Sequence, residues 1–298
     1  MIRNLCRVVG LPVASSQQYF VPPVDPKEDG EDCENDCESC VEKLPSRFHV
    51  DEKRELYGMV KPWGVHVLVA TGKSDWVRKV ERESGTLTEA LAREDHGGKE
   101  RLMILASNIE PPEEYYTDSK KPTTVLLLPA FIFVNHVTNS DVPELMRRFI
   151  DTSPSVTTPL SSKPALYPSG DLSYRDCPHD YVVLLCSHKH RDARCGISAP
   201  LIKRELERHL RPRGLYRDSN DERPGGVGIY YVSHVGGHKF AANVLVYRKK
   251  EGQMIWLARI RPEHCEGLVK WTILEGKVVD PDRRLRGGWD RGKGVGSW

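Results

Sequence analysis

Residues 181–195 read YVVLLCSHKHRDARC, and this stretch decides how the second half of the chain folds. Its first five residues are continuously apolar, which is typical of a strand buried on both faces. The strand delivers Cys186 to its carboxyl end, and Cys195 follows after a polar loop. Ser198 and Pro200 suit the first turn of a helix, whose buried face is predicted by apolar residues every four positions at Ile202, Leu206 and Leu210.

A second polar cluster follows the next predicted strand, residues 228–232. It reads SHVGGHKFAAN from Ser233 to Asn243 and contains His234 and His238. Its paired glycines disfavour a helix and favour a tight loop. Ligand-binding residues of open α/β sheets gather beyond the carboxyl ends of strands, so we expect the two clusters to meet. Their four candidate metal or cofactor ligands are Cys186, Cys195, His234 and His238.

The order of the predicted elements indicates an α/β protein with two domains. Strands at 241–247 and 254–260 and a helix at 262–272 complete an order close to a thioredoxin-like domain, with a mixed sheet flanked by helices. Upstream, a first α/β domain is indicated by strands at 66–72, 101–106 and 124–134 and by helical stretches at 76–92 and 140–150. The predicted boundaries are a disordered acidic Cys-containing tail at 1–45, an N-terminal α/β domain at 46–150, a Ser/Pro-rich linker at 151–179, the thioredoxin-like domain at 180–275 and a basic Gly-rich tail at 276–298.

Composition narrows the classes of protein to which the chain can belong. The formal net charge is only +2, which gives no electrostatic reason to expect a nucleic-acid partner. The longest apolar run, 125–134, is far shorter than the roughly 20 residues of a spanning helix, so no membrane span is expected. Eight cysteines without a secretory signal indicate a reducing compartment, where clustered cysteines more often bind metal than form disulfides. Cys6, Cys177 and Cys265 are scattered and are interpreted as unpaired thiols.

Two thiolates and two imidazoles suit three kinds of site. The residues alone do not decide among these three, nor between them and a solvated surface loop that binds nothing. A structural zinc site usually has a Cys-x2–4-Cys pair, and eight residues separate Cys186 from Cys195. A thiol redox site would use Arg194 to lower the pKa of Cys195, but no Cys-x-x-Cys occurs in this cluster. A 2Fe–2S cluster with two Cys and two His ligands has a raised reduction potential, and its imidazoles can couple electron uptake to proton uptake.

These motifs resemble the sucrase/ferredoxin-like family of thioredoxin-like 2Fe–2S ferredoxins. The matching segments are CSHKHRDARCGISAP from Cys186 to Pro200, GLYRD from Gly214 to Asp218 and HVGGHKFAAN from His234 to Asn243. The resemblance implies an electron-transfer protein whose 2Fe–2S cluster is held by Cys186, Cys195, His234 and His238. We expect a one-electron carrier rather than a catalyst, with a flavin-containing reductase as its electron donor. The alternative is a zinc-stabilised protein-interaction module without redox activity.

The two ends of the sequence add expectations about the compartment. Ser297-Trp298 is similar to the terminal peptide by which some cytosolic iron–sulfur clients engage their targeting complex. This predicts docking through Trp298 and a cytoplasmic location. Arg3 and Arg7, with no acidic residue before Asp25, leave a weak mitochondrial presequence as the alternative.

A rival motif lies near the start of the chain. Cys33-x3-Cys37-x2-Cys40 has the spacing of the 4Fe–4S motif of radical-SAM enzymes. Five acidic residues between Glu31 and Glu38 crowd negative charge around it, and Ser39 stands where that motif usually has an aromatic residue. Zinc capture by these cysteines and an unliganded tail are the other two interpretations.

Overall fold

The segment singled out by the sequence forms the centre of a mixed sheet. In this computed structural model, which describes residues 19–94, 100–160 and 172–297, β6 (Tyr181–Cys186) lies parallel to β8 (Val227–Val232) and antiparallel to β9 (Val244–Arg248). Beyond β9 the sheet continues with β10 (Gln253–Leu257), β11 (Leu285–Asp290) and β12 (Val295–Ser297). A short strand, β7 (Tyr216–Arg217), pairs with β8.

The helix after β6 begins earlier than predicted. α5 (Ala193–Leu210) starts at Asp192, whose carboxylate accepts a hydrogen bond from the Arg194 backbone N–H and so caps the helix before Ser198. Pro200 therefore lies inside the helix. The predicted stripe of Ile202, Leu206 and Leu210 is buried against the sheet, as expected. The closing helical region is also present, as η6 (Pro262–His264), α6 (Cys265–Gly267) and η7 (Leu268–Ile273).

The N-terminal half adds five strands to the same sheet. They are β1 (Val65–Ala70), β2 (Leu102–Ser107), β3 (Thr123–Leu128), β4 (Ile132–Val137) and β5 (Tyr174–Asp176). The single strand predicted at 124–134 is a β3–β4 hairpin, because the chain reverses at Pro129–Phe131. The helical turns of this half are η1 (Val80–Arg82), α2 (Leu87–Arg93), α3 (Glu114–Thr117), η2 (Asn139–Asp141), α4 (Val142–Leu145) and η3 (Met146–Ile150).

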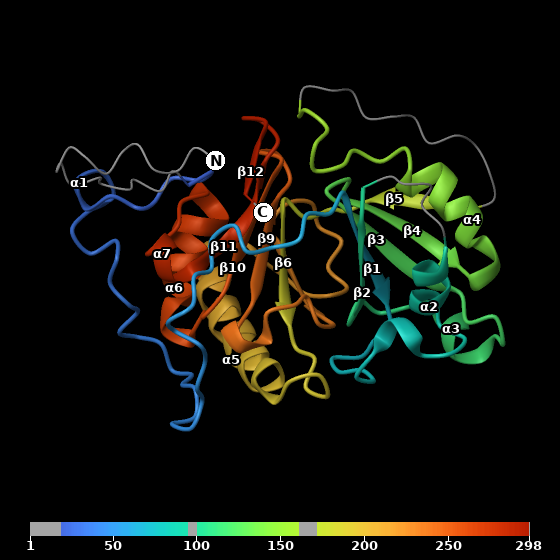
Figure 1. Cartoon of the computed structure of the whole chain (residues 1–298), viewed down its shortest axis with the longest axis horizontal. Helices are drawn as coiled ribbons and strands as arrows, with labels where there is room; N and C mark the ends of the chain where they lie inside the picture. The colour runs from blue at the N-terminus through green and yellow to red at the C-terminus, as the bar shows by residue number, and fades with distance from the viewer. Residues whose placement is uncertain (1–18, 95–99, 161–171, 298) are drawn as a thin grey trace, which may run out of the picture.

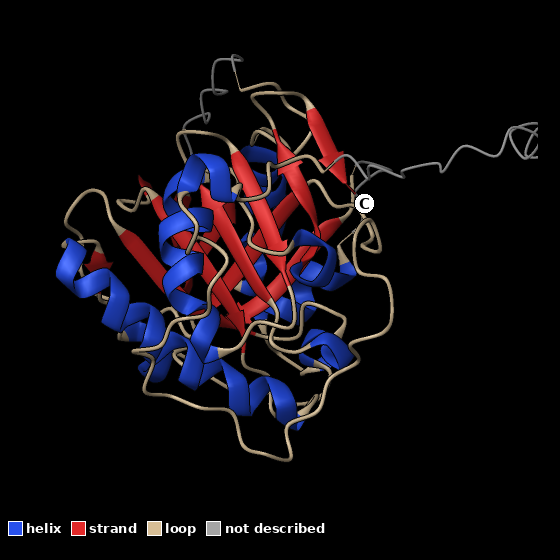
Figure 2. Ribbon diagram, turned by 90° about the vertical axis from the view of Figure 1, so that its left-hand side faces the viewer, coloured by secondary structure: helices blue, strands red, loops and turns tan. Residues whose placement is uncertain are grey.

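The two halves share one sheet and one apolar cluster. β2 meets β8 through the pair Ser107 and Val232, which gives the order β12-β11-β10-β9-β6-β8-β2-β1-β3-β4-β5 (Figure 1). Helices lie on both sides of this sheet (Figure 2). Leu68 and Leu126 of one half belong to the same buried cluster as Tyr247 and Trp256 of the other. The α/β class with a mixed sheet is therefore confirmed, whereas the division into two domains and the thioredoxin-like subdivision stay predictions.

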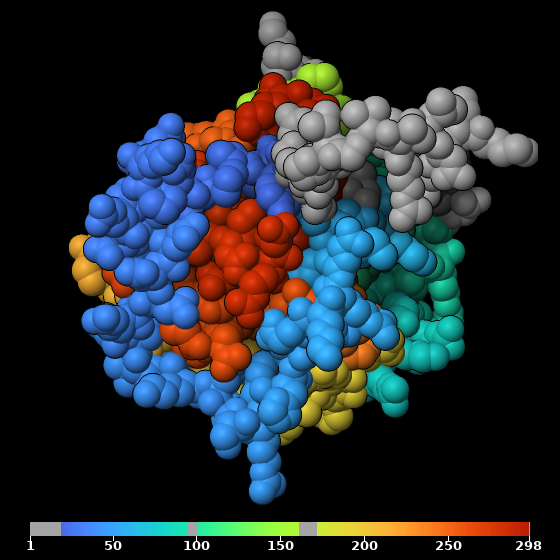
Figure 3. All heavy atoms as spheres, turned by 60° about the vertical axis from the view of Figure 1, so that its left-hand side comes forward, coloured from blue at the N-terminus to red at the C-terminus, as the bar shows by residue number. Residues whose placement is uncertain are grey.

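The segments predicted as tails differ from that expectation where the structure describes them. Residues 19–45, with α1 (Pro26–Asp29), lie across the C-terminal elements (Figure 3). Apolar Phe20, Val21 and Val24 are buried there, and the acidic residue Glu42 pairs with Arg204 of α5. Residues 276–298 contain α7 (Pro281–Arg284) and the paired strands β11 and β12, again because apolar residues between the charges are buried. None of the described helices is long and apolar enough to cross a membrane.

Candidate metal centre

The two cysteines of the 181–195 stretch meet at the carboxyl end of β6. Cys186 is the last residue of that strand and Cys195 lies in the first turn of α5, and both are buried. The loop between them ends at Asp192, which caps α5. The Asp192 carboxylate accepts a hydrogen bond from the backbone N–H of Arg194 and also binds the Arg194 guanidinium. The fold therefore brings both thiols to one place although eight residues separate them.

The histidine loop follows β8, the parallel neighbour of β6. Gly237 adopts φ +69°, which turns the chain back toward the sheet at η5 (His238–Phe240). The buried Arg286 of β11 donates to the Gly236 carbonyl (3.1 Å) and to Asn243 Oδ1 (2.8 Å), and Asn243 Nδ2 donates to the Gly237 carbonyl (3.2 Å). These three bonds fix the loop that carries both histidines.

Three of the four predicted ligands form a compact group. One donor atom from each of Cys186, Cys195 and His234 lies within 4.8 Å of the others, and we call these residues the C-terminal Cys/His group. The Cys186 Sγ lies 4.0 Å from His234 Nδ1. His238 contacts the other ring nitrogen of His234, with 3.5 Å between His238 Nδ1 and His234 Nε2. His238 is thus adjacent to the group, and its side chain is 42% exposed.

The electrostatics of the group distinguish its two sulfurs. Hydrogen bonding from the Cys195 thiol, together with that from His234, lowers the pKa of Cys186 well below the usual value despite its burial. The same Cys186–Cys195 bond and burial raise the pKa of Cys195. Burial also lowers the pKa of Arg286 to about 10, while the neighbouring Cys186 works in the opposite direction. Two sulfurs, one with a lowered pKa, beside an imidazole are a donor set suited to a soft or borderline metal, and the nearby Arg286 cation favours the thiolate form of Cys186.

Comparison with known proteins places the chain in a family. A model described as Sucrase/ferredoxin-like matches residues 56–287, a span that includes all four predicted ligands. The chain belongs to the Sucrase/ferredoxin-like family.

Relatives in this family differ in how much of the chain they match. The chain is 29% identical over 284 residues to Actin patches distal protein 1 of Saccharomyces cerevisiae, which covers 89% of this chain and 87% of that protein. It is 42% identical over 101 residues to Altered inheritance of mitochondria protein 32 of Clavispora lusitaniae, a region of 34% of this chain and 33% of that protein. The Kluyveromyces lactis protein of the same name is 26% identical over 275 residues, 79% of each chain. No solved structure matches.

In this Sucrase/ferredoxin-like chain, His188 is a positioning residue that sequence reasoning missed. It is buried, its Nδ1 accepts from the backbone N–H of His234 (3.2 Å), and its Nε2 donates to the carbonyls of Trp76 (3.0 Å) and Val77 (3.1 Å). Both ring nitrogens are therefore engaged by backbone groups, so His188 holds the two loops together rather than binding a metal. The only sequence signal was its place in the CSHKH segment, and nothing there indicates its partners.

The remaining cysteines separate into two kinds. Cys177 and Cys265 are buried and free, as predicted, and Cys6 lies outside the described residues. Cys37 and Cys40 lie beside His209, and these three residues form a second group that could hold a metal ion. Cys33 packs instead with Val24 and Trp271, so the three cysteines of the predicted rival motif do not converge.

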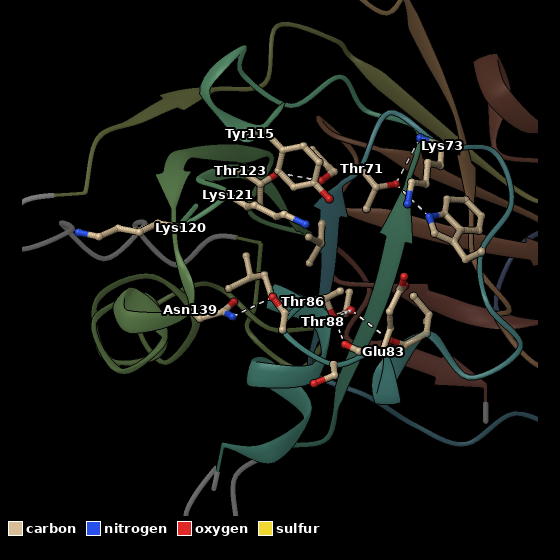
Figure 4. A pocket seen from close by; sticks show the side chains of 17 residues that line it. Thr71, Lys73, Glu83, Thr86, Thr88, Tyr115, Lys120, Lys121, Thr123 and Asn139 are labelled. Atoms are coloured by element: carbon tan, nitrogen blue, oxygen red, sulfur yellow. Dashed lines mark hydrogen bonds between the residues drawn. The ribbon is translucent and has the colours of Figure 1, made fainter. Parts of the chain in front are cut away.

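A separate cavity of about 130 Å³ lies in the N-terminal half, and among the described residues no cysteine or histidine lines it (Figure 4). Several of its hydroxyls are used internally: Thr71 donates to the Ser107 carbonyl, Thr123 to the Ala70 carbonyl, and Thr86 contacts Thr88. Its lining therefore offers no counterpart to the Cys/His chemistry at the end of β6.

Proposed function

We propose that this chain is an electron-transfer protein with a 2Fe–2S cluster held by Cys186, Cys195, His234 and His238. The observation that carries the proposal is the C-terminal Cys/His group, two buried thiols and an imidazole with a second imidazole in contact. Cysteine and histidine are the ligands of mixed-ligand 2Fe–2S centres. When bound, such a cluster takes up and releases single electrons, so the protein acts as a one-electron carrier rather than a catalyst.

The surroundings of the group suit that role. Burial of Cys186 and Cys195 keeps water from the sulfurs, and Arg286 supplies a positive charge near Cys186. His238 Nε2 lies 3.9 Å from Asp192 Oδ2 on the exposed side of the site. We assign to this imidazole the proton that accompanies electron uptake, because its side chain is 42% exposed whereas both cysteines are buried.

Anaerobic purification with iron and sulfide analysis tests the proposal first. About two irons and two sulfides per chain, visible absorption and a paramagnetic reduced state are expected, and all should be lost in Cys186→Ser. The control is Cys177→Ser, because Cys177 is also buried and free but lies outside the group. A colourless protein that holds zinc at Cys186 and Cys195 would establish the alternative, a zinc-stabilised interaction module.

His238→Cys tests the ligand set. The variant should keep a cluster, lower its potential by roughly 100 mV or more, and weaken the pH dependence of that potential, because a thiolate replaces a neutral imidazole. His190→Gln is the control, since His190 lies in the neighbouring loop but is bound to Asp75 (2.6 Å). Unchanged electrochemistry in His238→Cys removes His238 from the ligands.

Partners and compartment form part of the proposal. The donor is a flavin-containing reductase that docks where His238 is exposed, near the basic Arg191. The cytosolic iron–sulfur targeting complex engages Trp298, which lies outside the described residues and follows directly on β12. This assigns the protein to the cytoplasm, with mitochondria as the alternative. Cell fractionation, and cluster loading of Trp298→Ala in cells, test the two points.

A further inference from the structure

A second group of ligands lies at the other end of α5. The Cys37 Sγ is 3.7 Å and the Cys40 Sγ 3.6 Å from His209 Nε2, and we call these residues the N-terminal Cys/His group. Cys195 is in the first turn of α5 and His209 in the last. At about 1.5 Å per residue, the 14 steps from Cys195 to His209 span about 21 Å. The N-terminal group is therefore a separate site.

The spacing of the donors matches a tetrahedral metal. Bond lengths of about 2.3 Å for zinc to sulfur and about 2.0–2.1 Å for zinc to nitrogen, at a tetrahedral angle, place sulfur and nitrogen about 3.6 Å apart. Both sulfur–nitrogen distances in the group agree with this value. Cys37-x2-Cys40 also has the Cys-x2–4-Cys spacing of structural zinc sites.

A cation already lies among the three donors. Arg208 Nη2 is 3.0 Å from His209 Nε2, 3.7 Å from Cys37 Sγ and 3.5 Å from Cys40 Sγ. His209 can receive this hydrogen bond only through the lone pair of Nε2, so that lone pair points at the centre of the group. The Arg208 side chain is 36% exposed and can turn outward when a metal ion takes its place.

Glu205 offers a fourth donor. Its buried carboxylate places Oε2 3.8 Å from His209 Nε2, and Oε1 accepts from the backbone N–H groups of Val41 (2.6 Å) and Glu42 (2.7 Å). Oε2 now binds the Arg208 guanidinium (2.7 Å) and becomes available when that side chain leaves. An open hollow lined by Asp32, Asp36 and Glu38 leads to Cys37 and gives a cation a path of entry.

We infer that Cys37, Cys40, His209 and the Glu205 carboxylate bind one zinc ion, which fastens residues 33–42 to the end of α5. The backbone already follows this arrangement, since the Cys37 N–H donates to the Glu263 carbonyl (2.9 Å). The site has no open coordination position, so its role is structural. It holds in place an acidic segment that has few apolar residues to keep it folded. The inference is independent of the proposed electron transfer.

The zinc content of the full chain tests this inference. The chain is produced with Cys186→Ser and Cys195→Ser, so that zinc at the C-terminal Cys/His group does not contribute. About one zinc per chain is expected, and Co²⁺ in its place should give the intense visible bands of tetrahedral thiolate coordination. Cys37→Ser and Cys40→Ser should each weaken zinc binding at least about 100-fold and remove those bands. Arg208→Gln should retain zinc, because Arg208 competes with the metal.

Cys33→Ser is the matched control, since Cys33 belongs to the same motif but packs away from the group. It should keep the zinc. Limited proteolysis gives a second readout: chelation, like Cys37→Ser, should speed cleavage within residues 25–45. The inference is overturned by iron in place of zinc, by full zinc retention in both Cys37→Ser and Cys40→Ser, or by a chain that takes up no zinc after reduction. In the chain with Cys186 and Cys195 intact, Cys37→Ser should leave any iron–sulfur absorption unchanged, which separates the two proposals.

Discussion

Replacing Gly237 by alanine tests whether Arg286 holds the histidine loop. Gly237 has φ +69°, and a Cβ built on it lies 2.7 Å from Arg286 Nη1. The left-handed backbone costs alanine about 1–2 kcal/mol. If the guanidinium is displaced, its bond to the Gly236 carbonyl is lost, and a hydrogen bond from a charged donor is worth about 1.5–3 kcal/mol. Asn243 Oδ1 keeps its bond from Trp256 and so adds little to the cost.

Gly294→Ala separates the backbone cost from the clash. Gly294 has φ +66°, and no atom lies within 4 Å of a Cβ built there. We expect Gly294→Ala to lower the free energy of unfolding by about 1–2 kcal/mol and Gly237→Ala by about 2.5–5 kcal/mol. Urea denaturation of the metal-free chains, followed by tryptophan fluorescence, measures both, because a bound metal would disturb two-state behaviour. Gly237→Ala should also lose metal at the C-terminal Cys/His group. Equal destabilisation in the two variants would refute the role given to Arg286.

Three further predictions concern the buried histidines and the core. Burial lowers the pKa of His66 to about 3, so the native chain excludes a proton that the unfolded chain binds below about pH 6.5, and stability falls as the pH drops from about 6.5 toward 3. This loss is about 2 kcal/mol at pH 5. The free energy of unfolding, measured in urea at pH 7.5 and at pH 5, should therefore differ by about 2 kcal/mol less in His66→Gln than in the unmodified chain. The same pH difference in both proteins would contradict the assignment. His188→Gln should lower metal content severalfold while His190→Gln does not, measured by elemental analysis, because only His188 binds the His234 backbone. Leu206→Ala should lower the free energy of unfolding by about 2–5 kcal/mol in urea, since its side chain is fully buried, and a change below 1 kcal/mol would remove it from the core.

The sequence predicted the centre of the fold well, because hydrophobic period and turn signals agree there. The run 181–185 is a strand buried in a sheet, and the stripe from Ile202 to Leu210 is the buried face of α5. The carboxyl-end rule then placed Cys186 and His234 together. The start of α5 was missed because Asp192 caps it, and an aspartate among other charged residues gives no distinct signal.

The ends of the chain could not be predicted in the same way. β11 reads LRGGWD, with two adjacent glycines and no alternation, and it is a strand because β10 pairs with it. Arg286 lies within the segment 276–298 that the sequence predicted as a tail. Its hydrogen bond to the Gly236 carbonyl joins two residues 50 positions apart, so the sequence alone does not reveal it. Cys37 and His209 are 172 residues apart, so only the folded chain brings them together.

The N-terminal half takes part in the candidate metal centre although it supplies none of the four predicted ligands. Residues 74–77 follow β1 and bind the Cys186–Cys195 loop at three points: the Ser74 carbonyl accepts from Ser187 Oγ (2.6 Å), Asp75 Oδ1 accepts from the His190 backbone N–H (3.1 Å), and the Trp76 carbonyl accepts from His188. His188 in turn fixes the backbone of His234, so these contacts reach both sides of the ligand set. A C-terminal half alone would lose both carbonyl acceptors of His188 Nε2 and the Trp76 ring that packs against His188. The positions of the predicted ligands therefore depend on both halves of the sheet. These loop contacts also add to the single residue pair by which β2 and β8 join the two halves.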